Sequence, residues 1–382
     1  MIPYGKQHIT QEDIDAVVQV LQSDFLTQGP TIAEFENAFA GYIGSKYAVA
    51  VANGTAALHL SALALGVNSS TNVITTPITF SASANCVRYC GGNVFFADID
   101  AGTLTLDINK VEDLILSKPA GFFSGIIPVD FAGLPVNLEA FKMLANKYGL
   151  WILEDACHAP GAYFIDSNGN KQYAGNGNYA ELAIFSFHPV KHIATGEGGM
   201  ITTNDEKLYR KLLQLRSHGM VYQGNDKLIE NHGGWYMEMQ ELGFNYRLSD
   251  IQAALGISQL KKADERIKRR NEIAAIYNKA FEGTCIKILS LPTNVYHACH
   301  LYIIQVNDRK KLYDELRLNK IFAQVHYVPV HLMPYYKNIA DYTGKLPIAE
   351  NYYAKCLSIP MYPTLSNEEQ EFVINAIRNH CK

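Results

Sequence analysis

Short apolar runs alternate with amphipathic stretches along the first two thirds of the chain. Runs that are apolar on both faces are typical of strands buried in a parallel sheet, and the stretches between them have helical periodicity. Strands are predicted at 47–51, 72–76, 93–98, 125–129, 150–154, 183–187 and 199–203. Helices are predicted at 12–21, 55–65, 81–87 and 138–147. This alternation predicts an α/β fold with helices covering a mostly parallel sheet, whose ligands gather at the carboxyl ends of the strands.

Two of the predicted helices carry more specific expectations. The helix at 12–21 places Ile14, Val17, Val18 and Leu21 on one face. A second helix begins at Ser249, where Ser249 and Gln252 form a capping-box pattern. Its apolar positions continue to about residue 281, which suits one long helix joining two domains.

That junction divides the chain into a large domain, 1–248, and a smaller C-terminal domain, 249–382. The second part begins with the long helix and ends in an α+β region, with a strand at 298–306 and helices at 310–318 and 367–379. The long helix carries a run of basic residues, which favours a solvated face over a functional basic patch. The run consists of Lys261, Lys262, Arg266, Lys268, Arg269 and Arg270.

Composition removes several functional classes. The formal net charge of −4 gives no indication of nucleic-acid or anionic-membrane binding. No apolar run reaches transmembrane length, and the first fifteen residues have no apolar signal core. The seven cysteines are scattered and odd in number, which favours reduced thiols in a cytoplasmic protein. Cys86 and Cys90 lie four apart without a second pair, so no metal site is expected.

The first strand is followed by a candidate phosphate site. It leads into Asn53-Gly54-Thr55, where a helix begins. Such a junction directs free backbone N–H groups and the positive end of a helix dipole at one point, which suits a phosphate. A simple capping role for Thr55 is the alternative.

Two further strands end at residues whose side chains could take part in catalysis. Asp155 ends the strand at 150–154, three residues before His158, although a surface or capping role would also account for it. Ser186 lies at the end of another strand, and Lys191 follows five residues later, before a glycine-rich turn. A lysine in such a loop is a candidate Schiff-base residue, and an ordinary surface lysine is the alternative.

Together these motifs resemble the fold-type I pyridoxal-phosphate enzymes, and among them the DegT/DnrJ/StrS sugar aminotransferases. The resemblance covers nearly the whole chain, from Asn53-Gly54-Thr55-Ala56 through Thr79-Phe80 and Glu154-Asp155-Ala156 to Gly243-x-Asn245-Tyr246-Arg247. It implies a large domain built on a central, mostly parallel seven-stranded sheet, a smaller C-terminal α+β domain, and pyridoxal 5′-phosphate as the cofactor.

The resemblance also implies a role for each matching residue. Lys191 would form the Schiff base, and Asp155 would pair with the pyridinium nitrogen of the cofactor. Phe80 would stack on the ring, and His158 would face its 3′-oxygen. Thr55, Ala56 and Ser186 would hold the phosphate. Asn245 would reach the phosphate of the neighbouring subunit's cofactor, which implies a homodimer with shared active sites.

The expected substrates are a UDP-sugar and L-glutamate. Segments containing Thr27, Gln28, His326, Tyr327 and His331 resemble those that line the sugar-nucleotide pocket. The likeness is strongest to family members that aminate C4 of a UDP-linked 4-keto-6-deoxy-N-acetylhexosamine on the way to pseudaminic acid. A sister aminotransferase for another 4-keto nucleotide sugar is the alternative. A sugar dehydratase is disfavoured because family members of that kind carry histidine in place of Lys191. A silent binding protein is disfavoured by the intact motif set.

Overall fold

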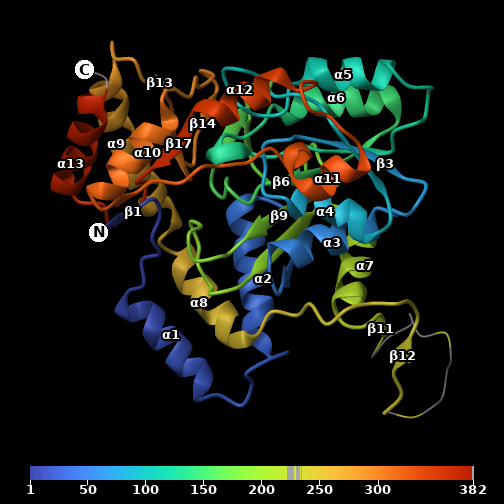
Figure 1. Cartoon of the computed structure of the whole chain (residues 1–382). Helices are drawn as coiled ribbons and strands as arrows, with labels where there is room; N and C mark the ends of the chain where they lie inside the picture. Colours follow the sequence, from blue (N-terminus) through green and yellow to red (C-terminus); the bar gives the residue numbers. More distant parts are fainter. Residues whose placement is uncertain (222–227, 229–232, 234, 381–382) are drawn as a thin grey trace.

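The computed structural model describes residues 1–221, 228, 233 and 235–380 and has a seven-stranded sheet at its centre (Figure 1). The strand order is β2-β10-β9-β6-β5-β3-β4. The strands are β2 (Tyr47–Val51), β3 (Asn72–Thr75), β4 (Asn93–Phe96), β5 (Gly125–Ile127), β6 (Trp151–Asp155), β9 (Leu182–Ser186) and β10 (Gly199–Thr203). All seven predicted strands are confirmed, with ends within two residues of those expected.

The sheet is mostly parallel, as predicted. Neighbouring strands run parallel from β4 to β9, and β10 alone pairs antiparallel, with β9 on one side and β2 on the other. Because β2 and β9 both oppose β10, the carboxyl ends of β2, β6 and β9 lie at one edge of the sheet. The segments that follow these strands therefore meet there.

Helices cover both faces of the sheet. Phe35 and Phe39 of α2 (Pro30–Ile43) pack with Phe185 and Phe187 on one face. Leu58 and Leu60, which belong to α3 (Gly54–Ala64), pack with Ile184 on the other. The remaining helices of this region are α3 (Gly54–Ala64), α4 (Ala82–Tyr89), α5 (Ile108–Leu116), α6 (Leu138–Tyr148) and α7 (Glu206–Arg216). The predicted helices that correspond to α3, α4 and α6 are confirmed.

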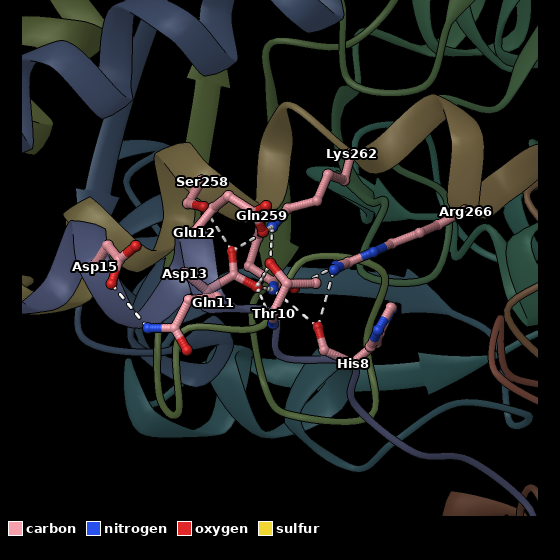
Figure 2. Close-up of polar contacts among 10 residues, drawn as sticks. All are labelled: His8, Thr10, Gln11, Glu12, Asp13, Asp15, Ser258, Gln259, Lys262 and Arg266. Atoms are coloured by element: carbon pink, nitrogen blue, oxygen red, sulfur yellow. Dashed lines mark hydrogen bonds and ion pairs between the residues drawn. The ribbon is translucent and has the colours of Figure 1, made fainter.

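Helix α1 (Gln11–Leu21) forms where predicted, and its apolar face is mostly exposed. Ile14, Val18 and Leu21 are 48%, 41% and 54% exposed, whereas the Asp13 side chain is fully buried. Figure 2 shows the reason: Asp13 points toward residues of the later helices, at the centre of a polar network. The polar contacts of Asp13, and not the apolar residues, determine which side of α1 packs against the rest of the protein.

That network also accounts for a break in the predicted long helix. The structure contains α8 (Asp250–Leu260) and α9 (Ala263–Phe281), separated at Lys261 and Lys262. The capping box of Ser249 and Gln252 forms as predicted. At the break, Lys262 Nζ donates to Asp13 Oδ1 at 2.8 Å, while Ser258 Oγ donates to the same oxygen at 2.6 Å (Figure 2). The prediction of one continuous helix is therefore wrong.

The basic run is not a uniformly solvated face. Lys261 and Lys268 are exposed, but Arg266 and Arg270 are buried. Arg266 donates to the backbone oxygen of His8 at 2.9 Å, and Arg270 Nη1 donates to backbone oxygens of three residues, Cys299, His300 and Met361. These arginines satisfy buried carbonyl groups, a role that helical spacing does not reveal.

The C-terminal part of the chain forms smaller sheets and further helices. Strand β15 (Tyr302–Gln305) pairs with β13 (Lys287–Ile288) and β17 (Cys356–Ile359). The helices are α10 (Arg309–Leu318), α11 (Pro334–Ile339), α12 (Pro347–Lys355) and α13 (Asn367–His380). The strand predicted at 298–306 is thus shorter than expected, and the helices predicted at 310–318 and 367–379 are confirmed.

The N-terminus joins this part of the molecule. Strand β1 (Ile2–Pro3) pairs in parallel with β16 (Ile321–Phe322). Figure 1 shows β1 beside the orange and red C-terminal elements. The remaining short strands are β7 (Tyr163–Ile165), β8 (Lys171–Tyr173), β11 (Met220–Val221), β12 (Glu238–Met239) and β14 (Val295–Tyr296). The domain boundary at Ser249 stays a prediction.

The cysteines depart from the expectation at one position. Five are free thiols, namely Cys86, Cys90, Cys157, Cys299 and Cys356. Cys285 is disulfide-bonded, so the prediction of reduced thiols is wrong for that residue. Cys381 lies outside the described residues. Among the described residues, no helix is both long and apolar enough to cross a membrane.

Candidate active site

A cavity of about 500 Å³ lies where the carboxyl ends of β2, β6 and β9 meet. Its walls include the segment after β3 and a loop of the C-terminal part, which contributes His326 and Tyr327. Eight residues predicted from the sequence line it: Thr55, Phe80, Asp155, His158, Ser186, Lys191, His326 and Tyr327. Residues far apart in the sequence therefore meet at the sheet edge where ligands were expected.

One end of the cavity is a backbone cradle at the start of α3. Asn53 caps the helix by accepting from the Ala56 N–H at 2.8 Å. Within the described residues, the N–H groups of Gly54 and Thr55 donate to no other group. A Cβ on Gly54 would lie 3.0 Å from the Ser186 Cβ, so glycine permits the close approach of β9 to this loop. Free N–H groups at a helix N-terminus, with the Ser186 hydroxyl beside them, suit a phosphate.

Lys191 has the environment of a reactive amine. Burial lowers the pKa of its ammonium group, while Cys157 and Asp155 oppose that shift. Its Nζ forms no hydrogen bond or ion pair within the part of the chain that the structure describes. A half-buried lysine that forms no ion pair adds little to stability and is suited to covalent chemistry.

Asp155 lines the same cavity, and both of its carboxylate oxygens accept hydrogen bonds. Its Oδ2 accepts from the Ser83 hydroxyl at 2.6 Å, and its Oδ1 accepts from the Cys157 N–H at 3.2 Å. The Ser83 hydroxyl is 2.8 Å from that of Thr79. Both hydroxyl groups line the cavity as well.

The neighbouring acid, Glu154, is turned away from the cavity. Its carboxylate accepts from the Gly175 N–H at 3.0 Å, and the side chain is buried. Burial raises the pKa of Glu154 well above its usual value, and the charge of Asp130 raises it further. Burial likewise raises the pKa of Asp130 to about 7. Only Asp155 among these three acids lines the cavity.

His158 is a neutral donor aimed into the cavity. Burial lowers the pKa of its imidazole well below the usual value, and the charge of Lys191 adds to that effect. Its Nδ1 accepts from the Ala132 N–H at 3.3 Å, which assigns the proton to Nε2. Nε2 lies 3.3 Å from the Tyr327 hydroxyl, and the ring of His300 packs 4.3 Å away, centroid to centroid.

Aromatic side chains form the remaining wall. Phe80 is 61% exposed within the cavity lining, so its ring has a free face. The ring of Tyr327 lies 6.4 Å from it, and that of Tyr4 lies 5.0 Å from His326. Burial lowers the pKa of His326 to about 3, so this imidazole is neutral and can share hydrogen bonds with a polar ligand.

Several predicted residues do not line the cavity. Ala56 lies beside it, but Asn53 already takes its N–H. Thr27 and Gln28 are exposed, and Thr27 forms a backbone bridge with Ser249. Asn245 is exposed and bridges Ser217.

His331 lies apart from the cavity and is fully buried. Its Nε2 is 3.2 Å from Glu350 Oε1, and its ring packs near Phe96. The contacts of His331 with Glu350 and Phe96 indicate a structural role.

Several other residues of the lining had no predicted role, among them Tyr4, Ser83 and Cys157. Ser83 lies three residues after Phe80, just beyond the segment that carried the resemblance, so only its nearness to that segment could have drawn notice. Tyr4 reaches the cavity because β1 pairs with β16, a contact between the two ends of the chain that no local pattern predicts.

These features fit the expected cofactor. The cradle at Gly54 suits its phosphate, the free face of Phe80 suits its ring, and the unpaired Lys191 suits its aldehyde carbon. Asp155 supplies a carboxylate for a protonated ring nitrogen. The donor set is therefore that of a pyridoxal-phosphate site.

Comparisons with known proteins agree with this geometry. The model of the DegT/DnrJ/EryC1/StrS aminotransferase family matches residues 7–378. The UDP-4-amino-4,6-dideoxy-N-acetyl-beta-L-altrosamine transaminase of Campylobacter jejuni is 38% identical over 98% of this chain and 96% of its own. The spore coat polysaccharide biosynthesis protein SpsC of Bacillus subtilis is 38% identical over 100% of this chain and 97% of its own.

Solved structures of similar proteins extend over the same length. Helicobacter pylori PseC, an aminotransferase of pseudoaminic acid biosynthesis, has a TM-score of 0.88 at 31% identity and covers 100% of this chain and 99% of its own. The sugar aminotransferase Spr1654 of Streptococcus pneumoniae, in its PMP form, has a TM-score of 0.90 at 28% identity and covers 99% of this chain and 98% of its own.

Proposed function

Because this chain belongs to the DegT/DnrJ/EryC1/StrS aminotransferase family and uses pyridoxal phosphate, we propose that it transfers the amino group of L-glutamate to C4 of a UDP-linked 4-keto-6-deoxy-N-acetylhexosamine. The acceptor is the L-arabino sugar on the way to pseudaminic acid. The observation that carries the proposal is the cavity that unites Lys191, Asp155, Ser186 and Thr55 at one sheet edge. The 38% identity to a transaminase of that sugar class supports the choice of acceptor.

The cofactor is held from three sides in this account. Thr55 and Ser186 hold its phosphate, with the N–H groups of Gly54 and Thr55 as donors. The contact expected of Ala56 stays a prediction, because its N–H donates to Asn53. Phe80 packs on the face of the ring, and His158 donates from Nε2 to its 3′-oxygen. Bound in this way, the cofactor supplies an electron sink for the departure of a proton from carbon.

Lys191 is the nucleophile and the proton carrier. Its lowered pKa favours the neutral amine, which is the form that attacks a carbonyl carbon. Its Nζ is also the base that removes the proton from Cα of L-glutamate and returns a proton at C4 of the sugar. Asp155 orients the cofactor ring, and its negative charge stabilises the positive charge on the ring nitrogen.

The sugar nucleotide occupies the outer part of the cavity. His326 and Tyr327 bring a neutral imidazole and a phenol to its wall, and both groups can donate to sugar or pyrophosphate oxygens. We leave His331 out of this site because its side chain is fully buried beside Glu350. Thr27 and Gln28 are exposed outside the cavity of their own subunit, and their contact with substrate stays a prediction.

The protein acts as a homodimer with shared active sites in this proposal. Asn245 supports it, because its side chain is exposed and does not line the cavity of its own subunit. It therefore remains free to reach the cofactor phosphate of a second subunit. A cytoplasmic location is a further prediction.

The acceptor is tested by comparing two epimers. With L-glutamate as the donor, kcat/KM is measured for the L-arabino and D-xylo forms of the UDP-linked 4-keto sugar. A misplaced polar group that loses its partner in a buried site costs roughly ten- to hundredfold in selectivity. We expect the L-arabino form to be preferred by at least that ratio. Equal values, or a preference for D-xylo, would contradict the assigned acceptor and leave an aminotransferase for a sister sugar.

A further inference from the structure

A chain of two hydroxyl groups leads to the Asp155 carboxylate. Thr79 Oγ1 lies 2.8 Å from Ser83 Oγ, and Ser83 Oγ lies 2.6 Å from Asp155 Oδ2. The side chains of Thr79, Ser83 and Asp155 are all buried, and all three line the cavity. No sequence motif predicts a role for Ser83.

The direction of the hydrogen bonds follows from the chemistry of the three groups. An ionised carboxylate only accepts, so the single proton of Ser83 points to Asp155. The lone pairs of Ser83 Oγ then accept the proton of Thr79. The Ser83 hydroxyl also lies 3.3 Å from the backbone oxygen of Phe80, a longer contact than the one to the carboxylate. Each donor in this chain therefore points toward the negative charge.

Besides Ser83, the charge of Lys191 favours the Asp155 carboxylate through space, without an ion pair. Within the described part of the chain, no lysine or arginine forms an ion pair with it, and its second oxygen accepts one N–H, that of Cys157. Two buried acids, Asp130 and Glu154, lie close enough for like charges to interact with it. Hydrogen bonds to a charged acceptor are stronger than those between neutral groups, so the Ser83 bond is a large part of the stabilisation available.

The same segment also holds the stacking aromatic. Thr79 precedes Phe80 and Ser83 follows it three residues later, and the Phe80 ring is exposed to the cavity. Ser83 is the second residue of α4. One short segment thus positions both the Phe80 ring and the Asp155 carboxylate, which line the same cavity. A change in Ser83 alters the carboxylate without removing the ring.

We propose that Ser83, aligned by Thr79, is a positioning residue that holds the Asp155 carboxylate in the orientation required by the protonated ring nitrogen of the cofactor. This inference rests on the role of Asp155 in the proposed function. The segment 79–83 then has two roles: Phe80 packs on the ring of the cofactor, and Ser83 positions the Asp155 carboxylate. Ser83 acts through Asp155 and does not touch the reacting carbon.

The test uses the full-length protein loaded with pyridoxal phosphate. Two quantities are measured: the dissociation constant of the cofactor, by titration of the apoprotein, and single-turnover formation of 2-oxoglutarate over a range of L-glutamate concentrations. Ser83→Ala should weaken cofactor binding and lower the maximal rate by roughly tenfold or more, the loss expected for a hydrogen bond to a charged group. The half-saturating glutamate concentration should stay within about twofold of the wild type, since Ser83 makes no contact with the donor.

Matched variants separate positioning from folding. Ser81→Ala removes a hydroxyl two residues away that makes no capping hydrogen bond, so it should leave both quantities unchanged. Ser83→Thr retains the hydroxyl and should restore most of the rate. Thr79→Val removes only the outer donor and should reduce the rate less than Ser83→Ala does.

A double-mutant cycle with Asp155→Asn decides whether Ser83 acts through Asp155. In the Asp155→Asn background, Ser83→Ala should cost less than about twofold, because the charge that it supports is gone. Equal fold losses in both backgrounds, or a Ser83→Ala protein that behaves like Ser81→Ala, would overturn the inference while leaving the proposed function in place. Near-normal turnover by Asp155→Asn alone would instead overturn the role given to Asp155.

Discussion

At the residue scale, the site depends on positions where a small side chain permits a close approach. Gly54 is one, because a Cβ there would lie 3.0 Å from the Ser186 Cβ and 3.3 Å from its hydroxyl oxygen. Such contacts are tighter than ordinary van der Waals distance, so β9 and the start of α3 would have to separate. The two groups that would separate are those assigned to the cofactor phosphate.

Gly54→Ala should therefore weaken binding of pyridoxal phosphate by roughly tenfold or more, through lost phosphate hydrogen bonds. The dissociation constant is measured by absorbance titration of the apoprotein. Gly41→Ala is the matched control: Gly41 lies within α2, and a Cβ there would meet nothing within 4 Å. That change should leave cofactor binding unaltered and stabilise the helix by about 0.5–1 kcal/mol. Unchanged cofactor affinity in Gly54→Ala would argue against the phosphate site.

The sequence was sufficient for the residues whose roles follow from motif and position. Thr55, Asp155, Ser186 and Lys191 were expected at one edge of a sheet, and all line the cavity. The positions of Tyr4 and His331 could not be predicted from the sequence, for opposite reasons. Tyr4 reaches the cavity through pairing between the two ends of the chain, whereas His331 shares a loop with Tyr327 but turns toward Glu350. Both outcomes depend on tertiary contacts.

At the element scale, periodicity predicted the strands well because each is short, apolar and buried on both faces. It failed at residues 261 and 262, where the predicted helix divides into α8 and α9. It also gave no sign that α1 fully buries Asp13 while Ile14, Val18 and Leu21 are exposed. One polar network causes both departures, and a hydrophobic pattern contains no information about it.

Asp13 is the centre of that network, so Asp13→Asn should lower the free energy of unfolding. Burial raises the pKa of Asp13, but hydrogen bonds from Lys262, Ser258 and the Thr10 N–H outweigh burial and lower it to about 2. Relative to the ordinary aspartate pKa of 3.8, this corresponds to about 2 kcal/mol of stabilisation at neutral pH. Urea denaturation measures the loss. Asp15→Asn is the control in the same helix, because exposed Asp15 accepts only from Gln11 (Figure 2); a loss as large as that of Asp13→Asn would contradict the account.

The pH dependence of that difference has a definite sign. The folded-state pKa of Asp13 lies below the unfolded value, so the unfolded state binds more protons between them. The stabilisation is fully present above pH 3.8 and is lost as the pH falls toward about 2. The difference between wild type and Asp13→Asn should therefore be constant from about pH 7 to pH 5 and shrink below about pH 4. A difference that grew on acidification would have the opposite sign and reject the assigned contacts.

At the scale of the whole molecule, the account requires two subunits for each complete site. Lys191 lines the cavity, whereas Asn245 is exposed outside the cavity of its own subunit. Mixing inactive Lys191→Ala and Asn245→Ala proteins should restore activity, because a hybrid dimer contains one site with both residues intact. Random exchange of equal amounts predicts about a quarter of the wild-type activity. Exchange is verified by native mass spectrometry, and no recovery after complete exchange would show that the sites are not shared.

The central claim is that the cavity at the carboxyl edge of the sheet is the pyridoxal-phosphate site and that Lys191 bonds to the cofactor. Borohydride reduction of the loaded protein, followed by peptide mass spectrometry, tests it most directly. The account predicts a single cofactor-modified peptide containing Lys191, and no labelling of the Lys191→Ala protein. Stoichiometric labelling of a different lysine in the wild-type protein would contradict it.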